Sequence, residues 1–426
     1  MSDPVFGIAA FAAALALIVF GMPVAVAMAA IGIAGTWWMT GWGAAVFALG
    51  SAPFEQIFPY SFSVIPLFVM MGVFASHAGL SRSLFDAINS FLGHLRGGLA
   101  VTTIGACAAF GAICGSSLAT VATIGRVALP EMRRHGYDDS LSAATVAAGG
   151  TLGVLIPPSI LLVIYGLLTQ VSIGALFVGA LIPGLLGATL YALAIVVRLR
   201  FAPENAPRLP ASSWPVRLRH LARVWSVVAL FALVIGGIYV GWFSPTEAAA
   251  VGAVGAFALA AFARQVSLPM LRASVAETAG LTGMIFFILI GAGFFNFLLE
   301  GTGLPQYLIA SIEASGLSAT AVMVLILVFY VVLGCFMDSM SMILLTVPLV
   351  APVALGLGFD LVWFGIIVVT VAEIGLITPP IGMNLFVVQA SIPGLRLGTV
   401  VRGITPFILA DILRLTLLVS FPALVL

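Results

Sequence analysis

The chain has 426 residues, of which 62% are hydrophobic and only 7% are charged, and its mean hydropathy is +1.25. A soluble domain of this composition would expose large apolar patches, so the composition excludes a soluble protein and predicts a protein that lies in the bilayer. The net charge is +1, which leaves no basic excess to hold nucleic acid.

Apolar stretches long enough to form membrane helices recur along the whole chain. They lie at about 5–20, 24–40, 61–76, 99–130, 141–168, 174–197, 224–241, 246–263, 280–299, 318–355, 361–389 and 404–426. The first stretch follows no basic segment and has no clear cleavage site, so we interpret it as a retained helix. The pattern predicts an all-α, polytopic membrane protein.

Two stretches, 99–130 and 318–355, are too long for one span, and polar residues interrupt each near its middle. The interruptions read GAICGSSLAT and FMDSMSM. A re-entrant helical hairpin, which enters and leaves by the same face, would explain the first. For the second we expect a helix followed by a hairpin.

The arginines indicate a topology, because cytoplasmic loops collect them. If the first hairpin opens to the cytoplasm and the second opens outward, 14 of the 16 basic residues lie inside and both termini lie in the periplasm. Only Arg126 and Arg414 lie within spans. Segments 81–97 and 264–279 are mixed in polarity, and we interpret them as arms along the cytoplasmic face.

The chain repeats itself at a constant offset of 222 residues, which pairs Ser117 with Ser339 and Pro157-Pro158 with Pro379-Pro380. The opposite hairpin directions make the two copies inverted repeats, as in alternating-access transporters. The first repeat, 1–200, would hold scaffold helices at 5–76, a hairpin at 99–130, a broken helix at 141–168 and a helix at 174–197. The linker is 199–223. The second repeat, 224–426, would hold scaffold helices at 224–299, a hairpin within 335–357, a broken helix at 361–389 and a helix at 404–426.

The chemistry is expected where the backbone breaks. Each Pro-Pro pair removes N–H donors and frees carbonyls at membrane depth, and a desolvated Na⁺ is satisfied by such oxygens. The first candidate sodium site comprises Gly115, Ser116, Ser117, Gly149, Thr151, Gly153 and Pro157. The second comprises Asp338, Ser339, Ser341, Glu373, Gly375, Thr378 and Pro379. The alternative is that these small residues only allow close packing and kinks.

Ionisable residues inside spans are costly and therefore informative. We favour a functional role for Asp338 and Glu373, which fall at the second tip and break. Ser117, Arg126 and Asn384 are candidate substrate-binding residues, although Arg126 could equally pair with an acid or reach the cytoplasmic face. Asp411 and Arg414 lie three residues apart on one helix and should neutralise each other. No nucleotide-binding loop, metal-ligand spacing or nucleophile triad is found, so we expect neither an enzyme nor any metal besides sodium.

Two blocks of the sequence resemble the large membrane subunit of tripartite ATP-independent periplasmic (TRAP) transporters. They are GSSLATVATIGRVALPEMRRHGYDDSLSAATVAAGGTLGVLIPPSILLVIYG and DSMSMILLTVPLVAPVALGLGFDLVWFGIIVVTVAEIGLITPPIGMNLFVVQ, and the resemblance covers essentially the whole chain. It implies an elevator-type member of the ion-transporter superfamily, with sodium sites on the tip and break of each repeat. Arg126 stands where a small residue is expected in the family, so a special substrate contact there stays open.

The resemblance also implies function and partners. The chain would import organic acids, such as C4-dicarboxylates or sialic acid, across the bacterial inner membrane by sodium symport, without a cofactor. Its partners would be a small four-helix membrane subunit and a periplasmic substrate-binding protein. The alternative is a stand-alone ion-coupled anion carrier of the same superfamily, of the divalent-anion or arsenite type, which would need no binding protein.

Overall fold

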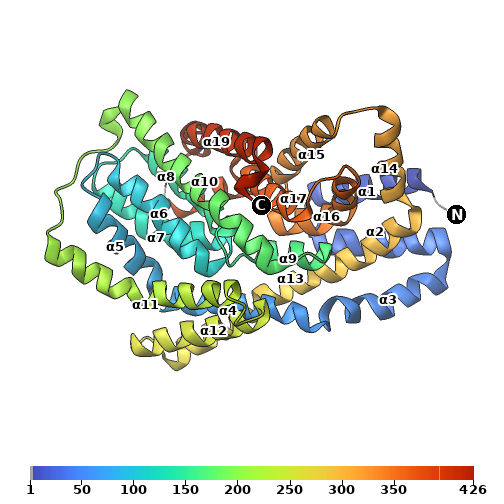
Figure 1. The fold of residues 1–426 in the computed structure, drawn as a ribbon, viewed down its shortest axis with the longest axis horizontal. Coiled ribbons are helices and arrows are strands. Elements are labelled where there is room, and N and C mark those ends of the chain that lie inside the picture. The colour runs from blue at the N-terminus through green and yellow to red at the C-terminus, as the bar shows by residue number, and fades with distance from the viewer. Residues whose placement is uncertain (1–2, 393) are drawn as a thin grey trace.

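The computed structural model describes residues 3–392 and 394–426, and every regular element within them is a helix (Figure 1). The first half contains α1 (Pro4–Val19), α2 (Val24–Thr40), α3 (Trp42–Ile57), α4 (Val64–His77), α5 (Leu80–Leu92), α6 (Gly98–Cys114), α7 (Ser117–Arg134), α8 (Asp139–Leu155), α9 (Ile160–Thr169) and α10 (Ile173–Phe201). The second half contains α11 (Trp214–Tyr239), α12 (Pro245–Phe262), α13 (Leu268–Thr302), α14 (Leu304–Ser315), α15 (Ala319–Gly334), α16 (Ser339–Gly356), α17 (Leu361–Ile377), α18 (Met383–Ser391) and α19 (Leu397–Ser420). The all-helical prediction is confirmed.

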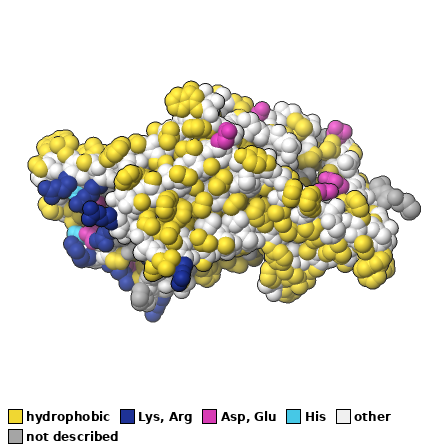
Figure 2. Space-filling model, turned by 90° about the horizontal axis from the view of Figure 1, so that it is seen from below, with side chains coloured by type: hydrophobic (Ala, Val, Ile, Leu, Met, Phe, Trp, Pro, Cys, Tyr) yellow, Lys and Arg dark blue, Asp and Glu magenta, His cyan; other side chains and the backbone are white. Residues whose placement is uncertain are grey.

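The protein is a multi-pass membrane protein. Within the described residues seven helices are long and apolar enough to cross a bilayer, and α8 with α9, bent by 42° at their break, would make an eighth. Hydrophobic side chains cover most of the face seen in Figure 2, while basic side chains gather at one end of it. The N-terminus lies toward the other end of the long axis (Figure 1).

Helix boundaries recur between the halves at the offset of 222 residues. α7 and α16 begin at Ser117 and Ser339, and α8 and α17 run over 139–155 and 361–377. The starts have the same cause, because Asp138 and Asp360 each accept backbone N–H bonds at the helix N-terminus. The peptide bonds Pro157-Pro158 and Pro379-Pro380 are both cis.

The core is built around α8 and α17. Every residue from Leu141 to Leu155 in α8, and every residue from Trp363 to Ile377 in α17, is buried. Helix α6 approaches α8 closely because both carry glycine at the contact: a Cβ added to Gly111 would lie 2.0 Å from the Cα of Gly153. The second half repeats this contact between α15 and α17, through Gly334 and Gly375.

Three details of the sequence prediction are wrong. Our list of spans left out α3, whose end is polar at Glu55-Gln56 and holds a proline at position 53. The second hairpin is α15 with α16, so the range 335–357 covers only its second arm. Segment 264–279 is mostly the first part of the continuous helix α13, and the counterpart of α5 is α14.

The break between α3 and α4 marks where the halves differ. The first half has a short 3-10 turn at Tyr60–Ser63, which starts after Pro59, whereas α13 continues through the matching position, Leu281. Proline has no N–H to continue a helix, so the sequence difference explains the structural one.

Candidate functional site

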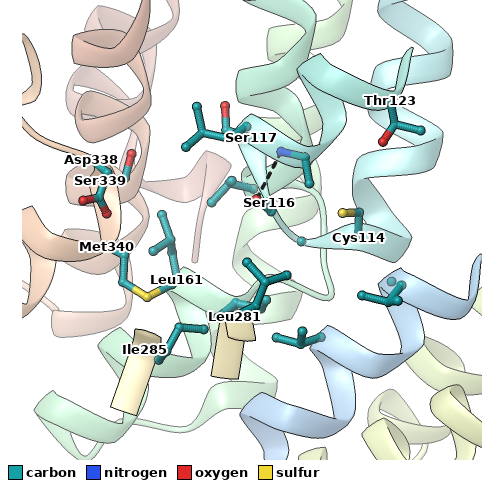
Figure 3. A pocket seen from close by; sticks show the side chains of 18 of the residues that line it. Cys114, Ser116, Ser117, Thr123, Leu161, Leu281, Ile285, Asp338, Ser339 and Met340 are labelled. Atoms are coloured by element: carbon teal, nitrogen blue, oxygen red, sulfur yellow. Dashed lines mark hydrogen bonds between the residues drawn. The ribbon is translucent and has the colours of Figure 1, made fainter. Parts of the chain in front are cut away.

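The two hairpin tips face each other across one cavity (Figure 3). Ser116 and Ser117 come from the tip between α6 and α7, and Asp338 and Ser339 from the tip between α15 and α16. Helices α4 and α13 form the opposite wall. Segments more than 200 residues apart in the sequence therefore meet at one place.

The first tip is shaped by a left-handed glycine and a serine cap. Gly115 has a φ of +63° and lies against the break, since a Cβ there would be 3.1 Å from the carbonyl oxygen of Pro158. The Ser116 hydroxyl accepts the backbone N–H of Ala119 at 3.4 Å, which caps α7. The N-terminus of α7, with its partial positive charge, therefore points into the cavity.

The broken helix beside this tip leaves backbone oxygens free. In a continuous helix the carbonyls of Gly153 and Val154 would accept from residues 157 and 158, but both of these are prolines and have no N–H. At the second break Pro379 and Pro380 likewise remove the helical donors for the Gly375 and Leu376 carbonyls. There the Thr378 N–H turns back and bonds the Gly375 oxygen at 3.1 Å, so the Leu376 carbonyl is the one left without a helical donor.

The second tip carries charge. Asp338 caps α16 by accepting the N–H of Ser341 at 3.0 Å, and the Ser341 hydroxyl donates to the same carboxylate at 2.5 Å. The Ser339 hydroxyl donates to Glu373 Oε1 at 2.8 Å. Glu373 is fully buried, and its Oε2 has no hydrogen-bond partner among the described residues. An unpartnered buried carboxylate oxygen is costly, which indicates a cation or a proton as its partner.

Asn384 connects the two halves. Its Nδ2 donates to the Ser117 hydroxyl at 2.9 Å and to the Ala147 carbonyl at 3.1 Å, although it lies in α18 of the second half. Asn384 is fully buried, and its Oδ1 has no partner among the described residues. Beside Ser117 lies therefore a second buried oxygen that a cation could satisfy.

The structure divides the predicted site residues into two groups. Gly115, Ser116, Ser117, Asp338, Ser339 and Glu373 line the cavity between the tips. Gly149, Thr151, Gly153, Pro157, Ser341, Gly375, Thr378, Pro379, Arg126 and Asn384 do not line it. The Thr151 hydroxyl bonds the Ala148 carbonyl at 2.7 Å and lies 3.0 Å from the Tyr191 hydroxyl, so it is not directed at the tip.

Arg126 lies apart from this cavity. It is exposed on α7 and lines a different cavity with Arg82, Asp86 and Glu131. Nine positions separate Arg126 from Ser117 on α7, which is about 13 Å of helix. This geometry therefore does not favour direct contact between Arg126 and a substrate held between the tips.

Sequence reasoning missed the wall of the cavity. Glu277 of α13 lines it, and its carboxylate lies 3.3 Å from the His77 imidazole of α4. Met284 and Ile285, both about two turns further along α13, line the same wall. The offset of 222 could have drawn attention to Glu277, because it pairs this residue with Glu55.

Comparison with known proteins identifies the family. The family described as "Tripartite ATP-independent periplasmic transporter, DctM component" matches residues 11–424. A C4-dicarboxylate TRAP transporter large permease protein from Pseudomonas aeruginosa is 38% identical over 373 residues, covering 87% of this chain and 86% of that protein. An ectoine/5-hydroxyectoine large permease protein from Ruegeria pomeroyi is 36% identical, covering 85% of each chain.

Solved structures share the fold at low sequence identity. The YdaH transporter of Alcanivorax borkumensis has a TM-score of 0.63 at 14% identity, covering 96% of this chain and 99% of that chain. MtrF of Neisseria gonorrhoeae has a TM-score of 0.56 at 13% identity, covering 91% and 85%. Both are membrane transporters, and the relatives above are permease subunits, not enzymes. The chain therefore belongs to the DctM family, the large permease components of tripartite ATP-independent periplasmic transporters.

Proposed function

We propose that this chain imports organic acids by sodium symport, with the ions held at the two tip-and-break sites and the substrate held between the tips. The observation that carries the proposal is the convergence of two capped helix N-termini and the carboxylates of Asp338 and Glu373 around one cavity. Glu373 has an unpartnered buried oxygen, and a second, on Asn384, lies beside Ser117 behind the cavity wall. Helix N-termini suit a carboxylate, while carbonyl, hydroxyl and carboxylate oxygens suit a desolvated Na⁺.

The substrate class rests on the relatives. Large permease proteins named for C4-dicarboxylate, sialic acid and ectoine transport match 85% or more of this chain. We assign carboxylates, with C4-dicarboxylates as the first choice because the 38% identical relative is named for them. The position of Glu277 on the wall implies that bound cations offset its charge while an anionic substrate is present.

The tripartite family name supports the partners. A periplasmic substrate-binding protein would deliver the acid, and a small four-helix membrane subunit would widen the fixed scaffold against which both hairpins move as an elevator. The alternative, a solitary ion-coupled carrier, would transport without either partner. Reconstitution separates the two.

The test uses purified chain in sealed liposomes, with and without a small four-helix membrane subunit and a periplasmic binding protein of the same transporter family. Labelled C4-dicarboxylate should accumulate only when both partners and an inward Na⁺ gradient are present. Uptake by the chain alone would establish the solitary carrier instead, and uptake with both partners that ignores the Na⁺ gradient would overturn sodium symport.

We propose that the halves are inverted in the membrane, with both termini outside. Arginines support this orientation, because they gather in the segments that it places in the cytoplasm. Single cysteines at Gly43 or Ser315, in a background with the native cysteines changed to alanine, should react with an impermeant thiol reagent added to intact cells. A cysteine at Ser212 should react only after permeabilisation, and labelling of Ser212→Cys in intact cells would overturn the orientation.

A further inference from the structure

Four fully buried polar side chains form a continuous polar network behind the first site. They are Thr151 of α8, Tyr191 of α10, and Asp411 and Arg414 of α19. Tyr191 donates to Asp411 Oδ2 at 2.6 Å, and Arg414 Nη2 lies 2.7 Å from Asp411 Oδ1. The Thr151 and Tyr191 hydroxyl oxygens lie 3.0 Å apart. This polar network therefore joins the broken helix of the first half to the last helix of the second.

The hydrogen bonds of the polar network have a defined direction. An ionised Asp411 only accepts hydrogen bonds, so Tyr191 donates its single proton to it. The Tyr191 oxygen can then only accept from Thr151, whose single hydroxyl proton is shared between the Ala148 carbonyl at 2.7 Å and the Tyr191 oxygen at 3.0 Å. Arg414 balances the carboxylate, as expected for two opposite charges three residues apart on one helix.

Small-residue packing makes room for the buried arginine. Gly187 lies one turn before Tyr191 on α10, and a Cβ there would lie 2.3 Å from Arg414 Nη1. The Arg414 guanidinium also lies 5.8 Å from the centre of the Tyr191 ring. Tyr191 is thus held by contacts to both its ring and its hydroxyl.

Contacts on two sides hold helix α8 in place. On one side a Cβ added to Gly150 would lie 3.2 Å from the backbone carbonyl oxygen of Ser117, and one added to Gly153 would lie 2.7 Å from the Thr120 hydroxyl. This side of α8 therefore packs on the first hairpin. On another side Thr151 is bound to Tyr191. The rotation of the last turns of α8, and with it the direction of the free carbonyls of Gly153 and Val154, depends on both contacts.

A buried ion pair gives little net stability, and apolar residues of the same volume often replace one without loss. Inside a membrane such groups indicate function. We infer that Tyr191, held by Asp411 and Arg414, is a positioning residue that fixes the broken end of α8 and thereby sets the sodium affinity of the first site. The inference rests on the proposed sodium symport.

The test compares Tyr191→Phe with Tyr165→Phe in the purified complex with the small subunit. Tyr165 is also fully buried, and its hydroxyl donates to the Leu361 carbonyl at 2.7 Å, outside the polar network. Melting temperature is measured against Na⁺ concentration, with K⁺ keeping the ionic strength constant, because a ligand that binds the folded state raises it. Both variants should melt lower without Na⁺, but only Tyr191→Phe should need more Na⁺, by about fivefold, because it alone removes the contact that holds Thr151 of α8.

Thr151→Val should reproduce the shift in Na⁺ dependence, and the double variant with Tyr191→Phe should add nothing further to it, because both remove the contact between these two hydroxyls. The bonds that each variant loses besides, to Ala148 and to Asp411, should lower the melting temperature alone. Equal sodium dependence of Tyr191→Phe and the wild type would overturn the inference while leaving sodium binding intact. So would additive effects of the two substitutions. A wild-type protein without any Na⁺ response would overturn the proposed symport and this inference together.

Discussion

The two tip-and-break pairs share a backbone and differ in charge. Both hairpin tips end in a capped helix, and both broken helices end in Pro-Pro. The caps differ, because Ser116 is neutral whereas Asp338 is a carboxylate, and Glu373 of α17 occupies the position of Thr151 in α8. The second site therefore carries acidic groups that the first lacks.

The first site draws on the other half of the protein instead. Asn384 of α18 reaches Ser117, and its Oδ1 remains without a partner among the described residues, whereas the matching residue of α9 is Leu162. A neutral site can still bind Na⁺ if enough oxygens converge on it. The difference teaches that one repeated backbone can carry acidic groups at one tip and none at the other, and that the neutral tip is bonded to the other repeat.

The largest effect is expected from Glu373→Gln. The substitution keeps the shape but removes the buried negative charge, and an interaction with a charged group contributes about 1.5 to 3 kcal/mol, or roughly 10- to 150-fold in affinity. The Na⁺ concentration for half-maximal uptake should rise by that factor. Wild-type sodium dependence in a correctly folded Glu373→Gln protein would remove the carboxylate from the second site.

Asn384→Leu should come next, because it gives the second break the residue found in the first. It leaves the Ser117 hydroxyl and the Ala147 carbonyl without their amide partner, at a cost of about 1 to 2 kcal/mol, or roughly 5- to 30-fold in sodium affinity. Leu162→Asn, at the matching position, is the opposite exchange. If Asn384→Leu left the sodium titration unchanged, the first site would not depend on the second half.

A smaller effect is expected from Asp338→Asn. Asparagine caps a helix as well as aspartate does, so the substitution removes charge without removing the cap. The group is only partly buried, so we expect about 2- to 5-fold weaker sodium dependence of uptake. Ser116→Asn exchanges one neutral cap for another at the matching position, and it should change less than Asp338→Asn. Equal effects would contradict the assignment of charge to the second site alone.

The smallest effect is expected from Arg126→Gln. Its side chain lines a separate cavity, so substrate KM and sodium dependence should both stay within about twofold of the wild type. Uptake titrated against substrate at saturating Na⁺ measures this directly. A tenfold rise in KM would show that Arg126 contacts the substrate in another state of the transport cycle.

Sequence reasoning was sufficient for the elements whose boundaries have local causes. The Pro-Pro breaks and the Asp138 and Asp360 caps are visible in the sequence, and the offset of 222 links them. The polar tips were visible because serine and aspartate interrupt apolar runs. The tips and breaks were enough to predict the six residues that line the cavity, while the resemblance of two longer blocks indicated the family.

Contacts between distant segments were not visible. Nothing in the sequence near Asn384 indicates a bond to Ser117, which lies 267 residues away. The polar network from Thr151 to Arg414 likewise joins three helices from both halves. The path of α13 was also misjudged, because its polar start resembled an interfacial arm. Tertiary packing decides these features, and a single sequence carries no direct record of it.

The central claim is that the two tip-and-break sites hold sodium. Binding of ²²Na⁺ to the purified complex, measured at equilibrium without substrate, tests it most directly. We predict saturable binding to the wild type, weaker binding to Glu373→Gln and to Ser117→Ala, and the weakest binding to the double variant. Absence of saturable binding to the wild type, or binding that neither substitution changes, would contradict the claim.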